Sequence, residues 1–287
     1  MIITDKTDSQ YTEPSRTGQG PEGIGSEEGS SVEKIPGAGE PASSLPSGVS
    51  PTHGCSGEDM LDRQRALIGD AATERLRGSR VLLFGVGGVG GYVLVALVRA
   101  GIGEIGVVDF DVVSPSNLNR QIIATADAVG RRKTELAAAR ARSINPLVGV
   151  TQFDCFAGAE NIPGIVAGYS PDFVVDAIDS TASKIEIIQA AKSLGIPVIS
   201  SMGTGNKLDP TRFRISDISR TRMCPLAKAV RIELRRRGIT DVPVLWSDEE
   251  PVVRRRTPAS ISFVPSVAGL LIGGYCIRRL AGLEGDG

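Results

Sequence analysis

The sequence predicts an α/β fold built on a doubly wound, mostly parallel sheet, with a mixed and basic extension towards the C-terminus. Three observations support this fold class. Short apolar runs alternate with segments of good helix formers, the first such run ends in a glycine-rich loop that leads into a helix, and later runs end in aspartate. Strands of a parallel sheet are buried on both faces, so they read as continuous apolar runs. The 287 residues suffice for one large domain of this kind or for two small ones.

A long polar segment precedes the first predicted element. Residues 1–57 are rich in Gly, Ser, Pro, Thr and Glu and show no apolar periodicity, which predicts a disordered tail. Residues 58–287 form the predicted folded part, and short helices over 60–69 and 71–76 open it. Arg63 lies on the first of these helices, where composition alone makes it an ordinary surface charge.

The next segment predicts a strand, a loop, a helix and a second strand in the order typical of nucleotide binding. Residues 81–84 form the first strand, residues 91–100 the helix, and residues 105–108 a strand that ends at Asp109. The loop carries the glycines Gly85, Gly87, Gly88 and Gly90. Glycines let the backbone approach a phosphate, the helix N-terminus offers free N–H groups, and an acidic residue about 20 positions later suits a ribose hydroxyl. We predict a phosphate-bearing ligand here, and the alternative is a glycine turn that only packs the helix on the strand.

A polar loop and another helix follow the second strand. The candidate ligand-binding residues are Asp111, Asn117, Arg120 and Gln121 in the loop and Lys133 near the start of a helix over 130–144. Ligands of open α/β sheets bind beyond the carboxyl ends of the strands, and a guanidinium can hold a phosphate through two parallel hydrogen bonds. The alternatives are a loop ion pair for Arg120 and a solvated ammonium for Lys133.

The predicted sheet continues through three more apolar runs. Strands are expected over 148–154, 173–180 and 197–201, and a helix over 183–194. Asp179 lies at the carboxyl tip of the second of these strands, which is the place to hold a magnesium ion beside phosphates. Its alternative role is to cap the helix that follows.

The character of the chain changes after residue 206. Lys and Arg outnumber Asp and Glu over residues 206–256, although the whole chain has a net charge of −1. We predict strands over 212–217 and 242–246 and a basic helix over 225–237. A local basic surface suits a polyanion, and the alternative is a set of solvated loops. The candidate polyanion-binding residues are Lys228, Arg231, Arg235 and Arg236.

The C-terminal segment, about 266–280, is apolar but interrupted by glycines. It is too short and too rich in glycine for a membrane-spanning helix, so we expect a helix that packs on the sheet or lies at a dimer interface. Membrane association remains the minority alternative. The N-terminus carries no signal-peptide pattern, which predicts a cytoplasmic protein.

Cysteine and histidine usage narrows the chemistry. The four cysteines form no CxxC pair, which argues against a disulfide framework and a structural zinc site. Cys224 stands before a proline-started helix, where a structural role and a reactive thiol are both open. The chain's single histidine, His53, lies in the polar tail, so acid–base catalysis by histidine is not expected.

Several of these motifs together resemble the ubiquitin-activating-enzyme-like (ThiF-type) adenylating superfamily, over about residues 59–280. The motifs are Arg63-Gln64, the glycine loop, Asp109-Phe110-Asp111, the Asn117–Gln121 segment, Lys133 and the Asp176–Asp179 segment. Within the superfamily, residues 200–210 and 223–228 are most similar to the tRNA threonylcarbamoyladenosine dehydratases. The resemblance implies a Rossmann-like fold, ATP and Mg²⁺ as cofactors, and a homodimer. It leaves open a monovalent cation and a sulfur-transfer or carrier partner.

The resemblance also implies roles for individual residues. Asp109 would bond the ATP ribose, Gly87 and Gly88 would let backbone approach the phosphates, and Asp179 would bind magnesium. The triphosphate would be held by Asn117, Arg120 and Lys133, and by Arg63 from the other subunit of a homodimer.

The implied reaction is the ATP-dependent dehydration, by cyclisation, of threonylcarbamoyladenosine in tRNA through an acyl-adenylate, with release of AMP and pyrophosphate. The alternative within the superfamily is adenylation of the C-terminus of a ubiquitin-like sulfur carrier. The activators of such carriers have two CxxC pairs, which this sequence lacks. Two further alternatives are a noncatalytic nucleotide-binding scaffold and a dehydrogenase, but neither needs the residues Arg120, Lys133 and Asp179.

Overall fold

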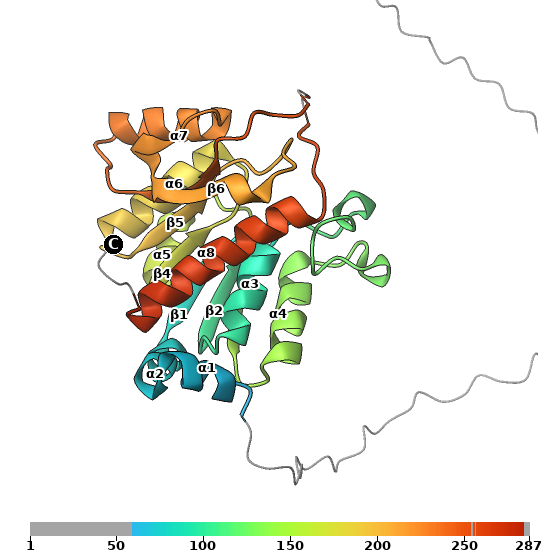
Figure 1. Ribbon diagram of the computed structural model, residues 1–287, viewed down its shortest axis with the longest axis vertical. Coiled ribbons are helices and arrows are strands. Elements are labelled where there is room, and N and C mark those ends of the chain that lie inside the picture. The colour runs from blue at the N-terminus through green and yellow to red at the C-terminus, as the bar shows by residue number, and fades with distance from the viewer. Residues whose placement is uncertain (1–58, 254, 256, 284–287) are drawn as a thin grey trace, which may run out of the picture. The chain divides into compact units, whose positions relative to one another are not determined.

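The computed structural model describes residues 59–253, 255 and 257–283, and the predicted tail over 1–57 lies outside them. In the described part, seven strands form one sheet in the order β3-β2-β1-β4-β5-β7-β6 (Figure 1). The strands are β1 Arg80–Phe84, β2 Glu104–Val108, β3 Gly149–Phe153, β4 Phe173–Asp176, β5 Val198–Ser201, β6 Phe213–Asp217 and β7 Pro243–Ser247. All neighbours pair in parallel except β6 and β7, which are antiparallel. The predicted fold class, a mostly parallel sheet with a mixed extension, is confirmed.

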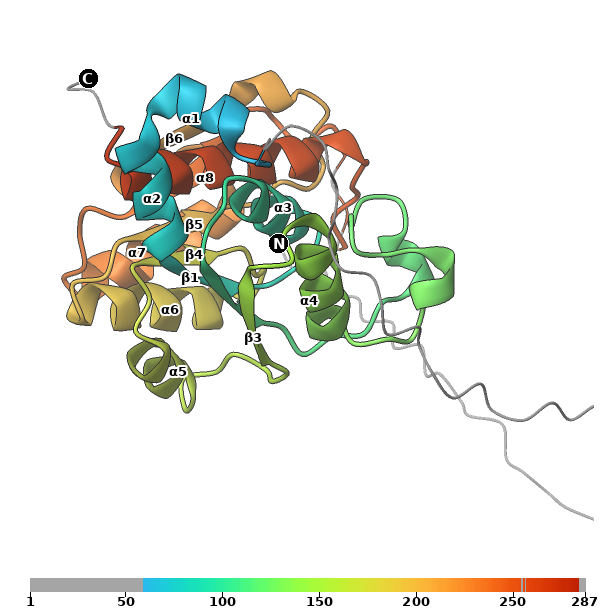
Figure 2. The ribbon, with the colours of Figure 1, turned by 90° about the horizontal axis from the view of Figure 1, so that it is seen from below.

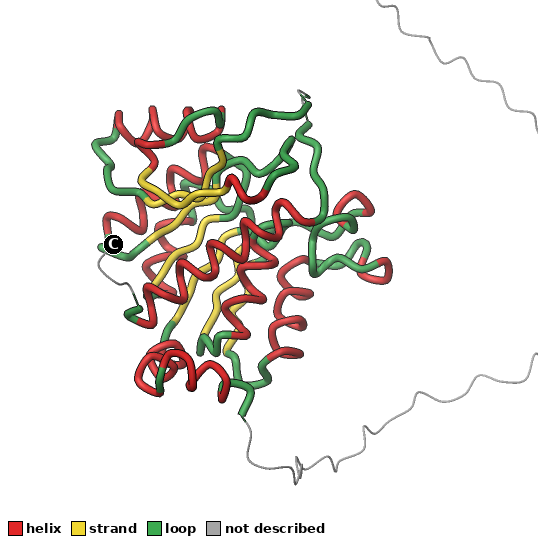
Figure 3. Tube along the Cα trace, viewed as in Figure 1, coloured by secondary structure: helices red, strands yellow, loops and turns green. Residues whose placement is uncertain are grey.

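Helices cover both faces of this sheet (Figures 1, 2 and 3). Their bounds are α1 Asp62–Ile68, α2 Asp70–Gly78, α3 Gly90–Arg99, α4 Lys133–Ile144, α5 Ile162–Tyr169, α6 Thr181–Ser193, α7 Pro225–Arg236 and α8 Phe263–Ala281. Side chains of α2, α3, α4 and α8 form one apolar core with the sheet, and side chains of α5, α6 and α7 form the other. Burial on both faces explains why the strands have no polar alternation.

Two helices begin three residues away from their predicted starts. Helix α8 starts at Phe263, because Pro265 is tolerated in a first turn whose N–H groups have no intrahelical partner. Helix α4 starts at Lys133 and not at Gly130, because an isolated antiparallel bridge between Val112 and Arg132 holds the preceding residues extended.

Helix α8 packs closely on α3. A Cβ built on Gly269 would lie 2.3 Å from the Val89 carbonyl oxygen, and one on Gly273 would lie 2.7 Å from the Ala96 Cβ, so only glycine fits at either position. Among the described helices, α8 alone is long and apolar enough to cross a membrane. Its inner face nevertheless joins the core of the domain. Its outer face exposes Phe263, Leu270 and Leu271.

The strand order identifies the ligand-binding edge of the sheet. Successive strands run outwards from β1 to β3 on one side and from β4 to β5 on the other, so the order reverses between β1 and β4. In open α/β sheets, the crevice at such a reversal, beyond the carboxyl ends of the strands, is where ligands bind. The glycine loop follows β1, and the segment with Asp179 follows β4.

Candidate active site

The glycine loop after β1 presents unused backbone donors. The Val86 N–H donates to the Asp109 Oδ2 at 2.9 Å, and the Asp111 N–H donates to the Asp109 Oδ1 at 2.9 Å, so this carboxylate fixes the loop. Within the described chain, the N–H groups of Gly87 and Gly88 donate to no acceptor. Free N–H groups at a helix start, together with the helix dipole, form a site for an anion.

The four motif glycines divide into two pairs. Gly85 has a φ of +85°, and a Cβ there would lie 2.9 Å from the Ala177 carbonyl oxygen. A Cβ on Gly90 would lie 1.8 Å from the Gly85 carbonyl oxygen. Gly85 and Gly90 therefore shape the loop, whereas Gly87 and Gly88 have more space around them and leave its surface open.

Lys133 is brought beside the end of β2. Its backbone N–H donates to the Asp111 carbonyl oxygen at 3.0 Å, and its Nζ lies 2.7 Å from the Asp111 Oδ2. The Lys133 residue is only 5% exposed. The structure thus holds a nearly buried ammonium next to the loop that carries Asp109, where its field is weakly screened by water.

Arg120 and Asn117 lie on the polar loop. The Arg120 Nη1 donates to the Ser116 carbonyl oxygen at 2.8 Å and to the Asn119 Oδ1 at 2.9 Å. The Arg120 Cγ lies 3.4 Å from a Cβ built on Gly88, so the arginine stem passes the glycine loop. The Asn117 Oδ1 accepts the Ser114 N–H at 3.1 Å, which means that Asn117 also closes the turn before Arg120.

Gln121 contributes a polar atom with no partner. The residue is 7% exposed, and its Oε1 is buried without a hydrogen bond inside the described structure. Its amide lies near Gly87, because the Nε2 is 3.7 Å from a Cβ built there. Buried polar atoms are almost always satisfied, so this one fits a site that a ligand or water completes.

Asp179 is exposed after the end of β4. Its carboxylate forms no hydrogen bond or ion pair with any other described residue. The helix cap that sequence reasoning gave Asp179 as an alternative is taken by Ser180, whose Oγ accepts the Ser183 N–H. The described residues hold no cluster of three or more metal-ligating side chains. A single free carboxylate beside phosphates is nevertheless the usual protein contribution to a Mg²⁺ site, so the donor set fits this ion.

A buried ion pair lies next to the segment that carries Asp179, and it was not predicted from the sequence. Asp176 and Lys184 are both fully buried, and the Lys184 Nζ lies 3.1 Å from both Asp176 carboxylate oxygens. The Ser200 Oγ donates to the Asp176 Oδ2 at 2.5 Å. The signal in the sequence was a lysine among the apolar residues of α6. The network ties α6 and β5 to the end of β4, from which Asp179 projects.

An aromatic pair was also missed. Phe110 and Phe156 follow β2 and β3, and their rings meet edge to face with centroids 5.2 Å apart. Both are about half exposed. They lie at the same edge of the sheet as Asp109 and offer an apolar surface there.

Arg63 does not join this site within its own chain. Its neighbour Gln64 donates from Nε2 to the carbonyl oxygen of Ala100, directly after α3, whereas the glycine loop precedes α3. The ten residues of α3 separate these points by about 15 Å. Arg63 is exposed, whereas Arg65 pairs with Asp59.

The candidate polyanion-binding residues on α7 differ in their surroundings. Lys228 and Arg235 are exposed. Arg231 donates to the Thr221 carbonyl oxygen at 2.7 Å, and Arg236 pairs with Glu233 at 2.6 Å. These two guanidiniums therefore serve contacts inside the protein as well.

Cys224 begins α7. Its Sγ accepts the Ala227 N–H at 3.5 Å, and the residue is 8% exposed. The thiol therefore acts as the cap of the helix, a role usually filled by serine or aspartate.

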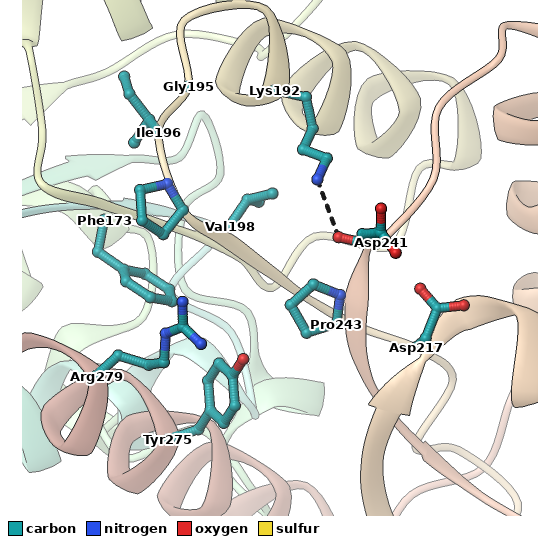
Figure 4. A pocket seen from close by; sticks show the side chains of 11 residues that line it. Phe173, Lys192, Gly195, Ile196, Val198, Asp217, Asp241, Pro243, Tyr275 and Arg279 are labelled. Carbon is teal, nitrogen blue, oxygen red and sulfur yellow. Dashed lines mark hydrogen bonds between the residues drawn. The ribbon is translucent and has the colours of Figure 1, made fainter. Parts of the chain in front are cut away.

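A cavity of about 520 Å³ lies elsewhere (Figure 4). Phe173, Val198 and Pro243 line it, and these residues stand at the amino ends of their strands. The Lys192 Nζ donates there to the Asp241 carbonyl oxygen at 3.0 Å. The cavity is thus at the edge opposite the glycine loop and is not part of the candidate site.

The chain is similar to known proteins over most of its described residues. The ThiF family matches residues 61–286. A tRNA threonylcarbamoyladenosine dehydratase from Bacillus subtilis is 41% identical over 240 residues, which cover 77% of this chain and 94% of that protein. A sulfur carrier protein adenylyltransferase from Thermus thermophilus is 39% identical over a shorter stretch of 143 residues, covering 49% of this chain and 52% of that protein.

Solved structures give the same result. The tRNA N6-threonylcarbamoyladenosine dehydratase of E. coli, in complex with ATP, has a TM-score of 0.73 and is 30% identical, covering 79% of this chain and 96% of that one. Its complex with AMP has the same TM-score and covers 77% and 93%. The family match and these likenesses extend over most of the chain, and the chain belongs to the ThiF family.

Proposed function

We propose that this protein uses ATP to dehydrate threonylcarbamoyladenosine in tRNA, closing a ring by way of an acyl-adenylate. The observation that carries this proposal is the pairing of an open glycine loop with the cations Lys133 and Arg120 at the point where the strand order reverses. This arrangement suits the stabilisation of phosphate charge. The similarity to the Bacillus and E. coli dehydratases over most of the chain supports this choice of substrate.

The chemistry needs no general base. The carboxylate of the threonylcarbamoyl group is ionised at neutral pH, because carboxyl pKa values lie near 4. It attacks the α-phosphate of ATP, a new C–O–P linkage forms, and pyrophosphate leaves. A nucleophilic atom of the same side chain then attacks the activated carbonyl, loses its proton and expels AMP. The net change is the loss of one water from the nucleoside.

The residues of the site divide this work among them. Lys133 and Arg120 neutralise charge that develops at the α-phosphate, and the free N–H groups of the glycine loop bind the phosphates. Asp109 accepts a ribose hydroxyl, for which its carboxylate oxygens retain lone pairs. Phe110 and Phe156 pack against the base. Mg²⁺, held by Asp179, would neutralise the departing pyrophosphate.

Replacing Asp179 with asparagine should raise the Mg²⁺ concentration required for half-maximal AMP formation, because the amide removes the charged ligand. AMP formation measured over a series of Mg²⁺ concentrations reports this shift. Asp70→Asn, at an exposed position of α2, is the matched control. An Asp179→Asn enzyme with the Mg²⁺ dependence of the control would remove Asp179 from the metal site.

We also propose a homodimer in which Arg63 serves the site of the other subunit. Two observations support it: Arg63 is remote from the glycine loop of its own chain, and the outer face of α8 exposes the apolar side chains of Phe263, Leu270 and Leu271. An exposed apolar helix face of this kind is typical of a subunit interface.

Mixing two inactive variants tests the shared site. In a heterodimer of Arg63→Ala and Lys133→Ala chains, one site has an intact Lys133 and receives Arg63 from its partner. Random pairing of equal amounts makes about half of the dimers heterodimers, and each heterodimer has one complete site out of two. The mixture should therefore restore about a quarter of wild-type turnover. A mixture as inactive as its components would show that Arg63 acts within its own chain.

The proposed function has a direct assay. Pure protein is incubated with ATP, Mg²⁺ and tRNA bearing threonylcarbamoyladenosine, with K⁺ or Na⁺ added in turn to test a monovalent-cation requirement, and the nucleosides are analysed by mass. ATP-dependent loss of one water is the expected result, and we place this reaction in the cytoplasm. An unchanged nucleoside, with ATP–pyrophosphate exchange stimulated by a ubiquitin-like carrier, would support sulfur-carrier adenylation instead.

A further inference from the structure

Three arginines that are scattered along the basic extension share one carboxylate. The Arg212 Nε lies 2.9 Å from the Asp248 Oδ1, and the Arg214 and Arg222 Nη2 atoms lie 3.2 and 3.5 Å from the Asp248 Oδ2. The Asp248 side chain is 10% exposed, whereas those of Arg214 and Arg222 are 60% and 68% exposed. We call Arg212, Arg214 and Arg222 the arginine cluster. One nearly buried carboxylate organises it and leaves an excess of positive charge facing solvent.

The arginine cluster lies at the same edge of the sheet as the candidate active site. Phe213 of β6 pairs with Ser247 of β7, so the start of β6 meets the carboxyl end of β7, which Asp248 follows. Strand β7 runs parallel to β5, and β5 to β4. Asp248 is therefore two strand spacings, about 10 Å, along this edge from β4, which leads to Asp179.

Local contacts hold the arginine cluster in a fixed position relative to the site. The Lys207 Nζ donates to the Glu249 carbonyl oxygen at 2.7 Å. The Glu249 carboxylate accepts the N–H groups of Leu208 and Asp209 at 2.8 and 3.1 Å. These bonds join the loop after β5 to the segment after β7, so the cluster and the crevice belong to one rigid frame.

Arg235–Arg237, which are adjacent in the sequence, are placed less favourably for binding the RNA next to the active site. Arg236 and Arg237 both pair with Glu233 and lower its pKa to about 2, so much of their charge is matched locally. Helix α7 begins beside Gly203, close to the carboxyl edge, because a Cβ on Gly203 would lie 3.4 Å from the Cys224 Sγ. Twelve residues of helix, about 18 Å, then carry its C-terminal arginines away from that edge.

We propose that the arginine cluster binds backbone phosphates of the tRNA beside the nucleotide that is modified. The proposal rests on the dehydratase function and adds a surface for its substrate. A guanidinium carries five N–H donors in a planar fork that matches a phosphate. Arg212 uses two of its nitrogens on Asp248, and Arg214 and Arg222 each approach Asp248 with one. Asp248 orients the three forks, and backbone phosphates then fix the register of the RNA without reading its sequence.

The salt dependence of tRNA binding tests the arginine cluster. We expect Arg214→Gln/Arg222→Gln to weaken binding of unmodified tRNA and to reduce the slope of log K against log salt by about one for each arginine. Arg99→Gln/Arg140→Gln, exposed positions on α3 and α4, is the matched control with the same change of charge. ATP binding, measured as the nucleotide-induced rise in melting temperature, should be equal in all three proteins.

The lysine variant separates charge from structure. Arg214→Lys/Arg222→Lys should restore the salt slope, because counterion release follows charge. A double glutamine variant with the wild-type slope and affinity, still able to dehydrate the nucleoside, would overturn this inference and leave the proposed function intact. If the wild-type protein itself neither binds tRNA nor dehydrates the nucleoside, the proposed function fails first.

Discussion

Replacing Lys133 with alanine should lower the rate of adenylate formation by about 100- to 1,000-fold, the loss typical of removing one preorganised charge-stabilising donor. The physical reason is burial. The Lys133 ammonium is 5% exposed and lies 2.7 Å from the Asp111 carboxylate, so it is already in place before the charge on the α-phosphate develops. Water that enters the space left by alanine would have to reorganise during the reaction. Single-turnover formation of AMP measures the effect.

The control for this variant is Lys192→Ala, since Lys192 is a lysine of α6 at the opposite edge of the sheet. It should leave the rate unchanged. Because Lys133→Ala also leaves Asp111 without its cation, Lys133→Ala/Asp111→Asn should fold as stably as the wild type and remain slow. A Lys133→Ala enzyme with wild-type kcat and a raised KM for ATP would mean that Lys133 binds the ground state only.

Replacing Lys184 with methionine should destabilise the protein by about 3–5 kcal/mol, the cost of leaving one member of a buried ion pair uncompensated. The Asp176 carboxylate is fully buried, so solvent cannot take the place of the Lys184 ammonium that lies 3.1 Å from it. The Ser200 hydroxyl alone cannot balance a full negative charge. Equilibrium unfolding in urea measures the change in the free energy of unfolding.

A second variant distinguishes the lost charge pair from lost packing. Lys184→Met/Asp176→Asn removes both charges and should recover much of the stability, because the amide can still accept from Ser200. If the double variant is no more stable than Lys184→Met, the loss comes from packing around α6 and not from an unpaired carboxylate.

The sequence predicted what depends on local pattern. Apolar runs and a glycine loop at the right spacing were enough for β1, α3 and β2, because each buried strand and each helix start leaves its own signal over a few residues. The sequence also placed Lys133 near the start of a helix, but its ion pair with Asp111 was not predicted, because it depends on the bridge between Val112 and Arg132 that closes the loop between them.

The features that the sequence could not predict depend on contacts between distant residues. Lys184 meets Asp176 and Ser200 only after α6 has packed across β4 and β5. The arginine cluster needs the antiparallel pairing of β6 with β7, which a run of charge does not encode. Within the run that is visible in the sequence, Arg235–Arg237, it is Arg236 and Arg237 that pair with glutamates.

The close packing of α8 has a consequence for how the protein is made. Gly269 of α8 contacts the Val89 carbonyl, and Pro265 adjoins Gly88, so the phosphate loop near the beginning of the domain packs on residues that the ribosome adds much later. Domains fold as units while the chain emerges from the N-terminus. A nascent chain whose α8 is still inside the ribosome therefore has every glycine of the loop but lacks the helix that packs against it. Nucleotide binding should therefore begin only after α8 has left the ribosome and packed on α3.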